Sequence, residues 1–163
     1  MKKIIITGKH NNDMLNKTEK KALRTNVNYK EPEHYEQVKL INNGYMNIKN
    51  DMDIFIKREI EKKMTGYKAQ DNKKQIKCQL ISYEEILEKL VISRLLCNYC
   101  KKKVKVLFEE VRDTKQWTLD RIDNDLGHTK DNTIICCLKC NLERRCLDSN
   151  KFEFTKQLKI TKS

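Results

Sequence analysis

Residues 117–141 read WTLDRIDNDLGHTKDNTIICCLKCN, and this stretch decides the fold that we expect for the chain. Trp117–Ile122 alternates as a short strand, Asn132–Cys136 alternates as its partner, and turn-forming residues fill the polar segment between them. Helix-forming residues follow Cys137. The stretch therefore predicts a unit of strand, loop, strand and helix.

Two CxxC pairs bracket this unit. Four thiolates brought together in this way match the tetrahedral geometry that Zn²⁺ takes at about 2.3 Å per sulfur. Either Cys136 or Cys137 could begin the second pair, but only Cys137 leaves two residues between the sulfurs, as in the first pair. We expect Cys136 to be a small buried residue of the second strand. The spacing assigns a structural zinc ion to Cys97, Cys100, Cys137 and Cys140.

The charge of the chain indicates a polyanionic partner. It has 163 residues, 35 Lys and Arg against 23 acidic residues, a formal net charge of +12 and a sequence pI near 9.3. The hydrophobic fraction of 38% suffices for a modest core, especially one that a metal ion stabilises. Such a balance favours binding to nucleic acid.

The cysteine content points to a reducing compartment inside the cell, the cytoplasm or the nucleus. Seven cysteines are present, four of them at metal-binding spacing, and we expect Cys78, Cys136 and Cys146 to be packing residues. No secretory signal or membrane-spanning apolar stretch is visible. Abundant Lys, Asn and Ile suggest an AT-rich coding sequence, as in a phage or virus genome.

We expect two parts, a basic N-terminal extension over residues 1–80 and a zinc-containing domain over residues 81–163. Within the extension, residues 1–44 are predicted to be a poorly structured basic arm. A first helix is predicted from about Asp51 to Thr65, ended by a glycine. Residues 66–77 are predicted to be a polar linker.

Ser82 and Glu85 form a capping box, which predicts a helix from there to about Leu95. The alternation in Lys101–Val111 predicts a strand or a hairpin arm. A last helix, capped by Ser149, is expected to turn three apolar side chains inward, namely Phe152, Phe154 and Leu158.

The predicted unit and its cysteine pairs resemble the HNH, or His-Me finger, endonucleases, and among them the endonuclease VII branch of phage enzymes. The resemblance covers about Cys97 to Leu147 and includes an acid near the end of the first strand, Asp120, and an amide directly after the last zinc ligand, Asn141. It implies an α+β fold with a zinc-stapled ββα-metal core, treble-clef-like, behind a basic, mostly helical extension. It also implies that Asn132 tethers the loop.

In that family the acid and the amide hold one divalent cation, so the resemblance implies Mg²⁺ or Mn²⁺ at Asp120 and Asn141. A carboxylate and an amide oxygen suit these hard cations better than a second Zn²⁺. Such a cation would bind the scissile phosphate and stabilise charge on the leaving oxygen. The alternative is that Asp120 is a turn residue at the end of the strand and that Asn141 caps the start of the helix.

The chain departs from the family at Arg121, where the family usually has the histidine that takes a proton from the attacking water. An arginine cannot be deprotonated at ordinary pH. His128 could act as the base instead, although a loop-tethering histidine is an equal alternative. Asp123 could instead orient or deprotonate a metal-bound water. The third alternative is a chain that binds nucleic acid without efficient cleavage.

Three arginines are candidates for phosphate binding. Arg144 and Arg145 follow Asn141 by about one helical turn, and Arg121 lies on the first strand. A guanidinium can hold two phosphate oxygens at once, whereas ordinary solvated surface is the alternative for each arginine. We expect Trp117 to be a core residue because it shares a strand face with Leu119.

The sequence therefore predicts a metal-dependent endonuclease that hydrolyses phosphodiester bonds in DNA, with RNA left open as the substrate. The first alternative is a non-catalytic, zinc-stabilised module that binds DNA or RNA. The second is a zinc-stabilised protein-interaction domain of the RING or treble-clef kind. This last alternative fits the cysteines but leaves the charge and the Asp120/Asn141 pair unexplained.

Overall fold

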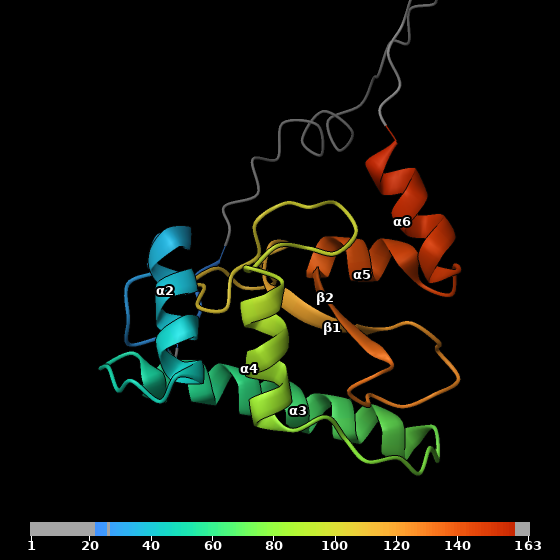
Figure 1. Cartoon of the computed structure of the whole chain (residues 1–163), viewed down its shortest axis with the longest axis horizontal. Helices are drawn as coiled ribbons and strands as arrows, with labels where there is room; N and C mark the ends of the chain where they lie inside the picture. The colour runs from blue at the N-terminus through green and yellow to red at the C-terminus, as the bar shows by residue number, and fades with distance from the viewer. Residues whose placement is uncertain (1–21, 26, 159–163) are drawn as a thin grey trace, which may run out of the picture.

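The computed structural model describes residues 22–25 and 27–158 (Figure 1). This part of the chain has a mixed α/β fold of five helices and one two-stranded sheet. In chain order the elements are α2 (His34–Tyr45), α3 (Asp53–Lys73), α4 (Tyr83–Ile92), β1 (Trp117–Arg121), β2 (Thr133–Cys137), α5 (Leu138–Arg144) and α6 (Ser149–Gln157). The predicted order of strand, loop, strand and helix is confirmed as β1, β2 and α5.

The two strands form an antiparallel hairpin in which Trp117 pairs with Cys137 and Arg121 pairs with Thr133. The side chains of Thr118 and Asp120 contact α5. Because successive side chains of a strand point to opposite faces, Trp117, Leu119 and Arg121 point away from α5. Trp117 and Leu119 are buried, which confirms their expected place in the core.

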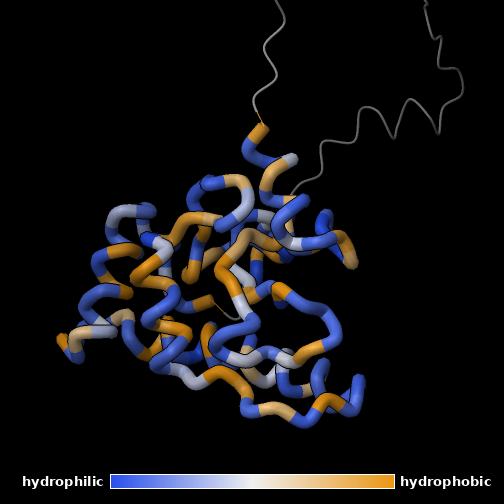
Figure 2. The backbone as a smooth tube through the Cα atoms, turned by 45° about the vertical axis from the view of Figure 1, so that its right-hand side comes forward, coloured by the Kyte–Doolittle hydropathy of each residue, from blue (hydrophilic) through white to orange (hydrophobic). Residues whose placement is uncertain are grey.

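Helices α2, α3 and α4 share one hydrophobic core with the hairpin. Figure 1 shows α3 passing below α4 and the hairpin, with α2 beside α4. The tube in Figure 2 shows hydrophobic positions recurring along the helices between hydrophilic ones, the pattern of helices buried on one side. No helix in the described residues is long and apolar enough to cross a membrane.

The expected poorly structured arm is wrong for residues 34–44, which belong to α2. The buried side chain of Gln37 explains why this segment is ordered. Its Oε1 accepts hydrogen bonds from the backbone N–H groups of Val106 and Leu107, and its Nε2 donates to the carbonyl oxygens of Pro32 and Leu107. Residues 1–21 of the arm lie outside the described residues.

The same contacts explain why Lys101–Val111 is not a regular strand. Two of its N–H groups bond to the Gln37 side chain instead of to a neighbouring strand, and only isolated bridges join this segment to others, including Lys105 with Gln116. A residue from the extension thus satisfies the buried backbone that a strand partner would otherwise satisfy.

Helix α3 is longer than predicted and continues through Gly66 to Lys73, so most of the expected linker is helical. The reason is tertiary, because Tyr67 and Asp71 in the additional turns are buried against the hairpin and its loop. Burial of these side chains outweighs the low helix propensity of a glycine. A Cβ at Gly66 would meet nothing within 4 Å, so its space does not require a glycine.

The capping box of α4 is confirmed: the Ser82 hydroxyl accepts from the Glu85 N–H, and the Ser82 N–H donates to the Glu85 carboxylate. The last helix also forms, with Asp148 rather than Ser149 as its N-cap. Phe152 is buried as expected, but Phe154 and Leu158 are 67% and 51% exposed. The inward orientation predicted for these two is wrong.

Candidate functional site

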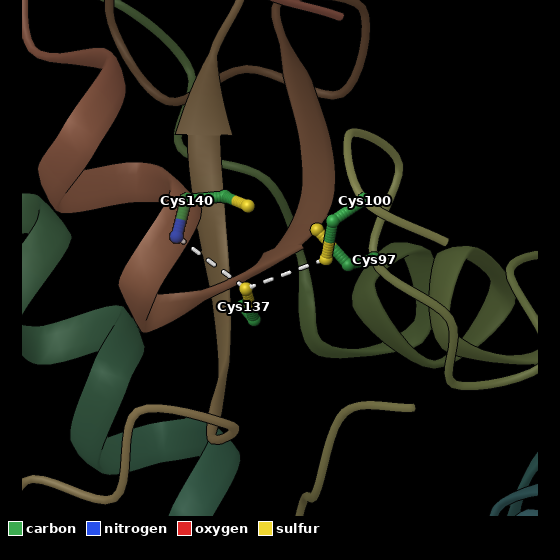
Figure 3. Close-up of side chains that lie close together, drawn as sticks. All are labelled: Cys97, Cys100, Cys137 and Cys140. Atoms are coloured by element: carbon green, nitrogen blue, oxygen red, sulfur yellow. Dashed lines mark hydrogen bonds between the residues drawn. The ribbon is translucent and has the colours of Figure 1, made fainter. Parts of the chain in front are cut away.

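The four predicted zinc ligands converge on one point (Figure 3). Their sulfur atoms all lie within 4.8 Å of one another, and the Sγ atoms of Cys100 and Cys137 are 4.0 Å apart. Four sulfurs in a tetrahedron at about 2.3 Å from a zinc ion would be about 3.8 Å apart. The donor set and its spacing therefore fit a structural zinc ion.

Local backbone bonds hold the two cysteine pairs in place. The first pair lies on the turn after α4, where the Lys101 N–H donates to the Cys97 carbonyl and the Asn98 N–H donates to the carbonyl of Ile135 on β2. The second pair joins β2 to α5. Cys137 is the N-cap of α5, and its sulfur accepts a hydrogen bond from the Cys140 N–H. The backbone bond from Asn98 to Ile135 thus brings the first turn alongside β2.

The thiols influence each other strongly. The pKa of Cys97 is lowered because the Cys137 thiol donates a hydrogen bond to its sulfur, and the pKa of Cys137 is raised by the same contact and by burial. The pair therefore loses one proton readily and resists losing the second. A divalent cation favours the second deprotonation, because thiolates and not thiols are its ligands.

The remaining cysteines divide into one buried and two exposed residues. Cys136 is buried on β2 beside the Thr118 hydroxyl, at 3.1 Å, as expected for a packing residue. Cys78 and Cys146 are exposed, so the expected packing role is wrong for both.

Asp120 is buried, with 6% of its surface exposed, and both of its carboxylate oxygens are engaged. Oδ2 accepts a hydrogen bond from the Tyr99 hydroxyl at 2.5 Å, and Oδ1 accepts one from Nη1 of Arg144 at 2.9 Å. Tyr99 lies between Cys97 and Cys100, so the turn that carries the first cysteine pair directly contacts the candidate catalytic acid. Burial and this hydrogen bond raise the pKa of Tyr99, which keeps the phenol a donor.

Arg144 is a buried structural residue in this arrangement, which corrects its expected role as a phosphate-binding residue. Only 2% of it is exposed, and besides Asp120 it donates to the carbonyl oxygens of Arg121 and Ile122 at 2.7 and 2.8 Å. These carbonyls lie at the end of β1, where a strand partner no longer satisfies them. Arg145 is exposed, as a phosphate-binding residue would be.

Asn141, on α5, contacts the two residues of β1 that precede Asp120. Its Nδ2 donates to the Thr118 hydroxyl at 3.1 Å and to the Leu119 carbonyl at 3.2 Å. These bonds fix the orientation of the amide, and its Oδ1 has no partner among the residues that the structure describes. Asn141 and Asp120 thus both lie where α5 packs on β1, with Asn141 bonded to Thr118 and Leu119 and Asp120 bonded to Arg144.

Asn132 tethers the loop between the strands, as predicted. Its Oδ1 accepts from the Asp123 N–H, and its Nδ2 donates to the carbonyl oxygens of Asp123 and Gly127. The Asp123 side chain is exposed and accepts a hydrogen bond from the Asp125 N–H. Of the two acid–base candidates on this loop, Asp123 is therefore the accessible one.

His128, the other candidate, is buried against α3. Its Nδ1 lies 2.8 Å from Oδ1 of Asp71, its backbone N–H donates to Oδ2 of the same carboxylate at 2.9 Å, and its ring stacks on Tyr67 at 4.6 Å between centroids. The ring thus contacts α3, whereas the Asp120 carboxylate contacts α5 and the metal-binding turn. This arrangement matches the loop-tethering alternative for His128.

Burial lowers the pKa of His128, and pairing with the Asp71 carboxylate offsets this only in part. For Asp71, burial raises the pKa, but the two hydrogen bonds from His128 and its charge outweigh burial, so the pKa of the carboxyl lies below its ordinary value. The pair is therefore a neutral imidazole held by an ionised carboxylate near neutral pH. Arg121 lies at the edge of this pair, with Nη1 at 3.9 Å from Oδ1 of Asp71 and a hydrogen bond to the Leu126 carbonyl.

The sequence missed three residues of this site: Tyr67, Asp71 and Tyr99. Tyr99 stands inside a CxxC pair, where a polar side chain faces the neighbourhood of the metal, so its position was a usable signal. Asp71 is one acid among exposed polar residues of α3, and nothing in the local sequence marks it as a partner of His128.

Comparisons of the chain with protein-family models, with curated proteins and with solved structures give no match.

Proposed function

We propose that this protein is a metal-dependent endonuclease that hydrolyses phosphodiester bonds in DNA through a zinc-stapled, treble-clef-like ββα-metal core. One observation carries the proposal: Asp120 of β1 and Asn141 of α5 both lie where these two elements pack together, and α5 begins at the four-cysteine cluster. Neither the cysteine cluster nor the pairing of the two strands requires an aspartate and an asparagine at these positions. The net charge of +12 supports a polyanionic substrate.

In this proposal the four cysteines hold a structural Zn²⁺, and Asp120 and Asn141 hold Mg²⁺ or Mn²⁺, which would polarise the scissile phosphate and stabilise the leaving oxygen. An ionised carboxylate has about four lone-pair sites, and the hydrogen bonds from Tyr99 and Arg144 use one on each oxygen, so Asp120 keeps lone pairs for a cation. Asp123 is the accessible group that orients or deprotonates the attacking water, and Arg145 is the exposed phosphate contact.

A second function, nucleic-acid binding without cleavage, is favoured by the bonds that Asp120 already makes. Its carboxylate has the two donors that a structural buried acid needs, and Arg121 stands where the family has its base. In that case Asp120 and Arg144 form a buried ion pair that supports the hairpin. The same basic protein then binds DNA or RNA and cuts neither.

The test is incubation of the zinc-loaded protein with supercoiled plasmid and with single-stranded RNA, in Mg²⁺ or Mn²⁺. Asp120→Asn is the informative variant, because Asp120→Ala would leave the buried Arg144 without its counter-charge and cost roughly 3–5 kcal/mol. The amide keeps a hydrogen-bond acceptor for Arg144 and removes the hard anionic oxygen. We expect Asp120→Asn and Asn141→Ala to abolish cleavage and to leave zinc content and DNA affinity nearly unchanged.

Arg144→Met is the matched control for the fold, because it removes the same ion pair from the other side and keeps the carboxylate. Its residual cleavage, measured on folded protein, separates loss of the ion pair from loss of the cation. A wild-type protein that binds nucleic acid and cuts none under these conditions supports the second function. Cleavage by Asp120→Asn at the wild-type rate would remove the catalytic role of this acid.

A further inference from the structure

A second candidate site lies away from the hairpin loop, in a cleft between the segment before α2 and helix α3. It consists of two adjoining cavities of about 430 and 630 Å³, both of which are lined by Arg24, Glu59 and Lys62. Five cations and two carboxylates line the cleft, and none of them belongs to the proposed catalytic site. The cations are Arg24, Arg58, Lys62, Lys63 and Arg112, and the carboxylates are Glu59 and Glu61.

Both carboxylates of the cleft already have partners. Glu59 is buried and paired with Arg24 at 2.6 Å, and Arg24 also donates to the Phe108 carbonyl and lies over the Phe108 ring. Glu61 lies 3.8 Å from Lys57 on the exposed side of α3. The remaining cations therefore find no free counter-charge within the cleft.

Three of those cations are exposed and available. Arg58, Lys62 and Arg112 make no ion pair or side-chain hydrogen bond with any residue in the described ranges, 22–25 and 27–158. Unpaired guanidinium and ammonium groups around a concave surface are suited to phosphate oxygens. By contrast, two of the three arginines predicted for this task, Arg121 and Arg144, bond to the protein itself.

Lys63 adds a half-buried ammonium to the same cleft. Its Nζ donates to the Gln116 side chain at 2.8 Å and lies 5.4 Å from the centre of the Trp117 ring. The pKa of Lys63 is lowered to about 8, chiefly by burial, and the charges of Arg24 and Lys62 contribute while that of Glu59 opposes the shift. An anion in the cleft would offset the repulsion among these cations and favour the charged form of Lys63.

We propose that this cleft binds the sugar-phosphate backbone of nucleic acid, with Arg58, Lys62 and Arg112 as the phosphate contacts. The inference rests on the proposed function for the identity of the polyanion, and it does not depend on cleavage. The cleft would hold the substrate on the α3 side while the β1-β2-α5 unit meets another part of it.

The test compares two triple variants of the full chain that remove the same charge. The cleft variant is Arg58→Ala with Lys62→Ala and Arg112→Ala. The control variant is Lys39→Ala with Lys103→Ala and Lys151→Ala, three exposed lysines that have no side-chain partner in the described part and lie outside the cleft. Binding to a short mixed-sequence DNA duplex is measured by fluorescence anisotropy over a series of salt concentrations, without Mg²⁺.

Loss of three phosphate contacts should lower the slope of log K against log salt by up to about 2.7, that is about 0.9 per contact, and should weaken binding by at least about tenfold at low salt. The control variant should change both quantities much less. Equal losses in the two variants would overturn the proposal, because they would mean that only net charge matters. Competition by polyglutamate as strong as that by DNA of equal charge would also overturn it, in favour of an acidic protein partner.

A second measurement follows Lys63 in the wild-type protein. Its NMR signal after reductive ¹³C-methylation is assigned by its absence in Lys63→Met, and its pKa is measured with and without the duplex. Binding of phosphate in the cleft should raise that pKa, and an unchanged pKa would overturn the proposal. Plasmid cleavage is measured separately. If the protein does not cut the plasmid but the cleft variant alone loses binding, only the endonuclease proposal is contradicted. If the protein cuts the plasmid but both variants lose binding equally, only the cleft proposal is contradicted.

Discussion

The two ends of the β1–β2 hairpin are held in different ways. At the end where Trp117 pairs with Cys137, four cysteine side chains converge, and each pair is only three positions apart in the chain. At the other end, beyond Arg121 and Thr133, the loop is held by the carboxylate of Asp71, which lies 57 residues before His128. The first end is held by a cluster of four cysteines that fits a metal ion, and the second by the Asn132 tether within the loop and by long-range polar contacts, above all that of His128 with Asp71.

This difference predicts different kinds of failure. Loss of the metal cluster should remove the element that joins the first turn, the hairpin and α5, whereas loss of Asp71 should release the loop and leave the rest folded. Asp120 lies between the two, because the metal-binding turn holds it through Tyr99. We therefore expect changes at the metal end to displace the Asp120 side chain and changes in the loop to leave it in place.

The largest effect is expected at the metal end. Cys100→Ser or Cys140→Ser removes a ligand of the cluster, and metal binding in such small domains supplies about 10 kcal/mol or more of folding free energy. We expect insoluble or molten protein without bound zinc, measured by metal analysis and near-UV circular dichroism. Cys146→Ser, at an exposed cysteine outside the cluster, is the control. Zinc-free protein that melts cooperatively at the zinc-loaded temperature would contradict this role.

At the loop end, Asp71→Ala should cost roughly 3 kcal/mol of unfolding free energy. The variant removes the acceptor of two His128 hydrogen bonds in a buried position, and the orphaned groups carry the cost. Urea unfolding measures the change, and zinc content should stay at the wild-type level. Asp125→Ala, in the same loop but exposed, should change stability by less than about 0.5 kcal/mol. Loss of zinc from Asp71→Ala would show that the two ends are not independent.

The pH dependence of stability should report the loop end as well. Because burial lowers the pKa of His128 below its ordinary 6.5, the unfolded chain takes up this proton first as pH falls. Stability should therefore fall below about pH 6.5, by at most about 1.4 kcal/mol per pH unit, until the folded histidine also titrates. The lowered pKa of Asp71 acts only near and below 3.8, where its contribution is lost.

His128→Gln, which cannot titrate, tests this assignment. Unfolding free energies measured between about pH 7 and pH 5 should depend less on pH in this variant than in the wild type. The same slope in both proteins would assign the acid sensitivity to other groups.

The smallest effect is expected at Gly127. A Cβ there would lie 2.2 Å from the Cys78 sulfur and 3.2 Å from Oδ2 of Asp71. Cys78 is exposed and its sulfur can turn away, so Gly127→Ala should cost only about 1 kcal/mol, and less in a Cys78→Ala background. Gly66→Ala, where nothing lies within 4 Å, should instead stabilise α3 by up to about 1 kcal/mol. A neutral Gly127→Ala would mean that the loop does not approach α3 this closely.

Short-range chemistry made parts of the site predictable. Alternation placed β1 and β2 within one residue of their observed bounds. The tethering role of Asn132 was expected from the family resemblance and not from the residues alone. Cys137 was chosen over Cys136 from spacing alone, and Cys136 is indeed turned away to the Thr118 hydroxyl. Arg144 was misjudged because an arginine on a short helix looks the same in sequence whether it faces solvent or the open carbonyls of a strand end.

The sequence by itself determined the four-cysteine cluster, the order of strand, loop, strand and helix, and the capped start of α4. Within each CxxC pair and within the capping box, the residues lie a few positions apart, and the chain sets their geometry locally. The two CxxC pairs are far apart in the chain, and their matched spacing marked them as ligands of one metal ion. Only the tertiary structure decided that α3 runs past Gly66, that Gln37 satisfies the backbone of the segment before β1, and that Asp71 holds His128. Those outcomes depend on which buried groups lack a partner after the chain has packed, and distant residues supply the partner.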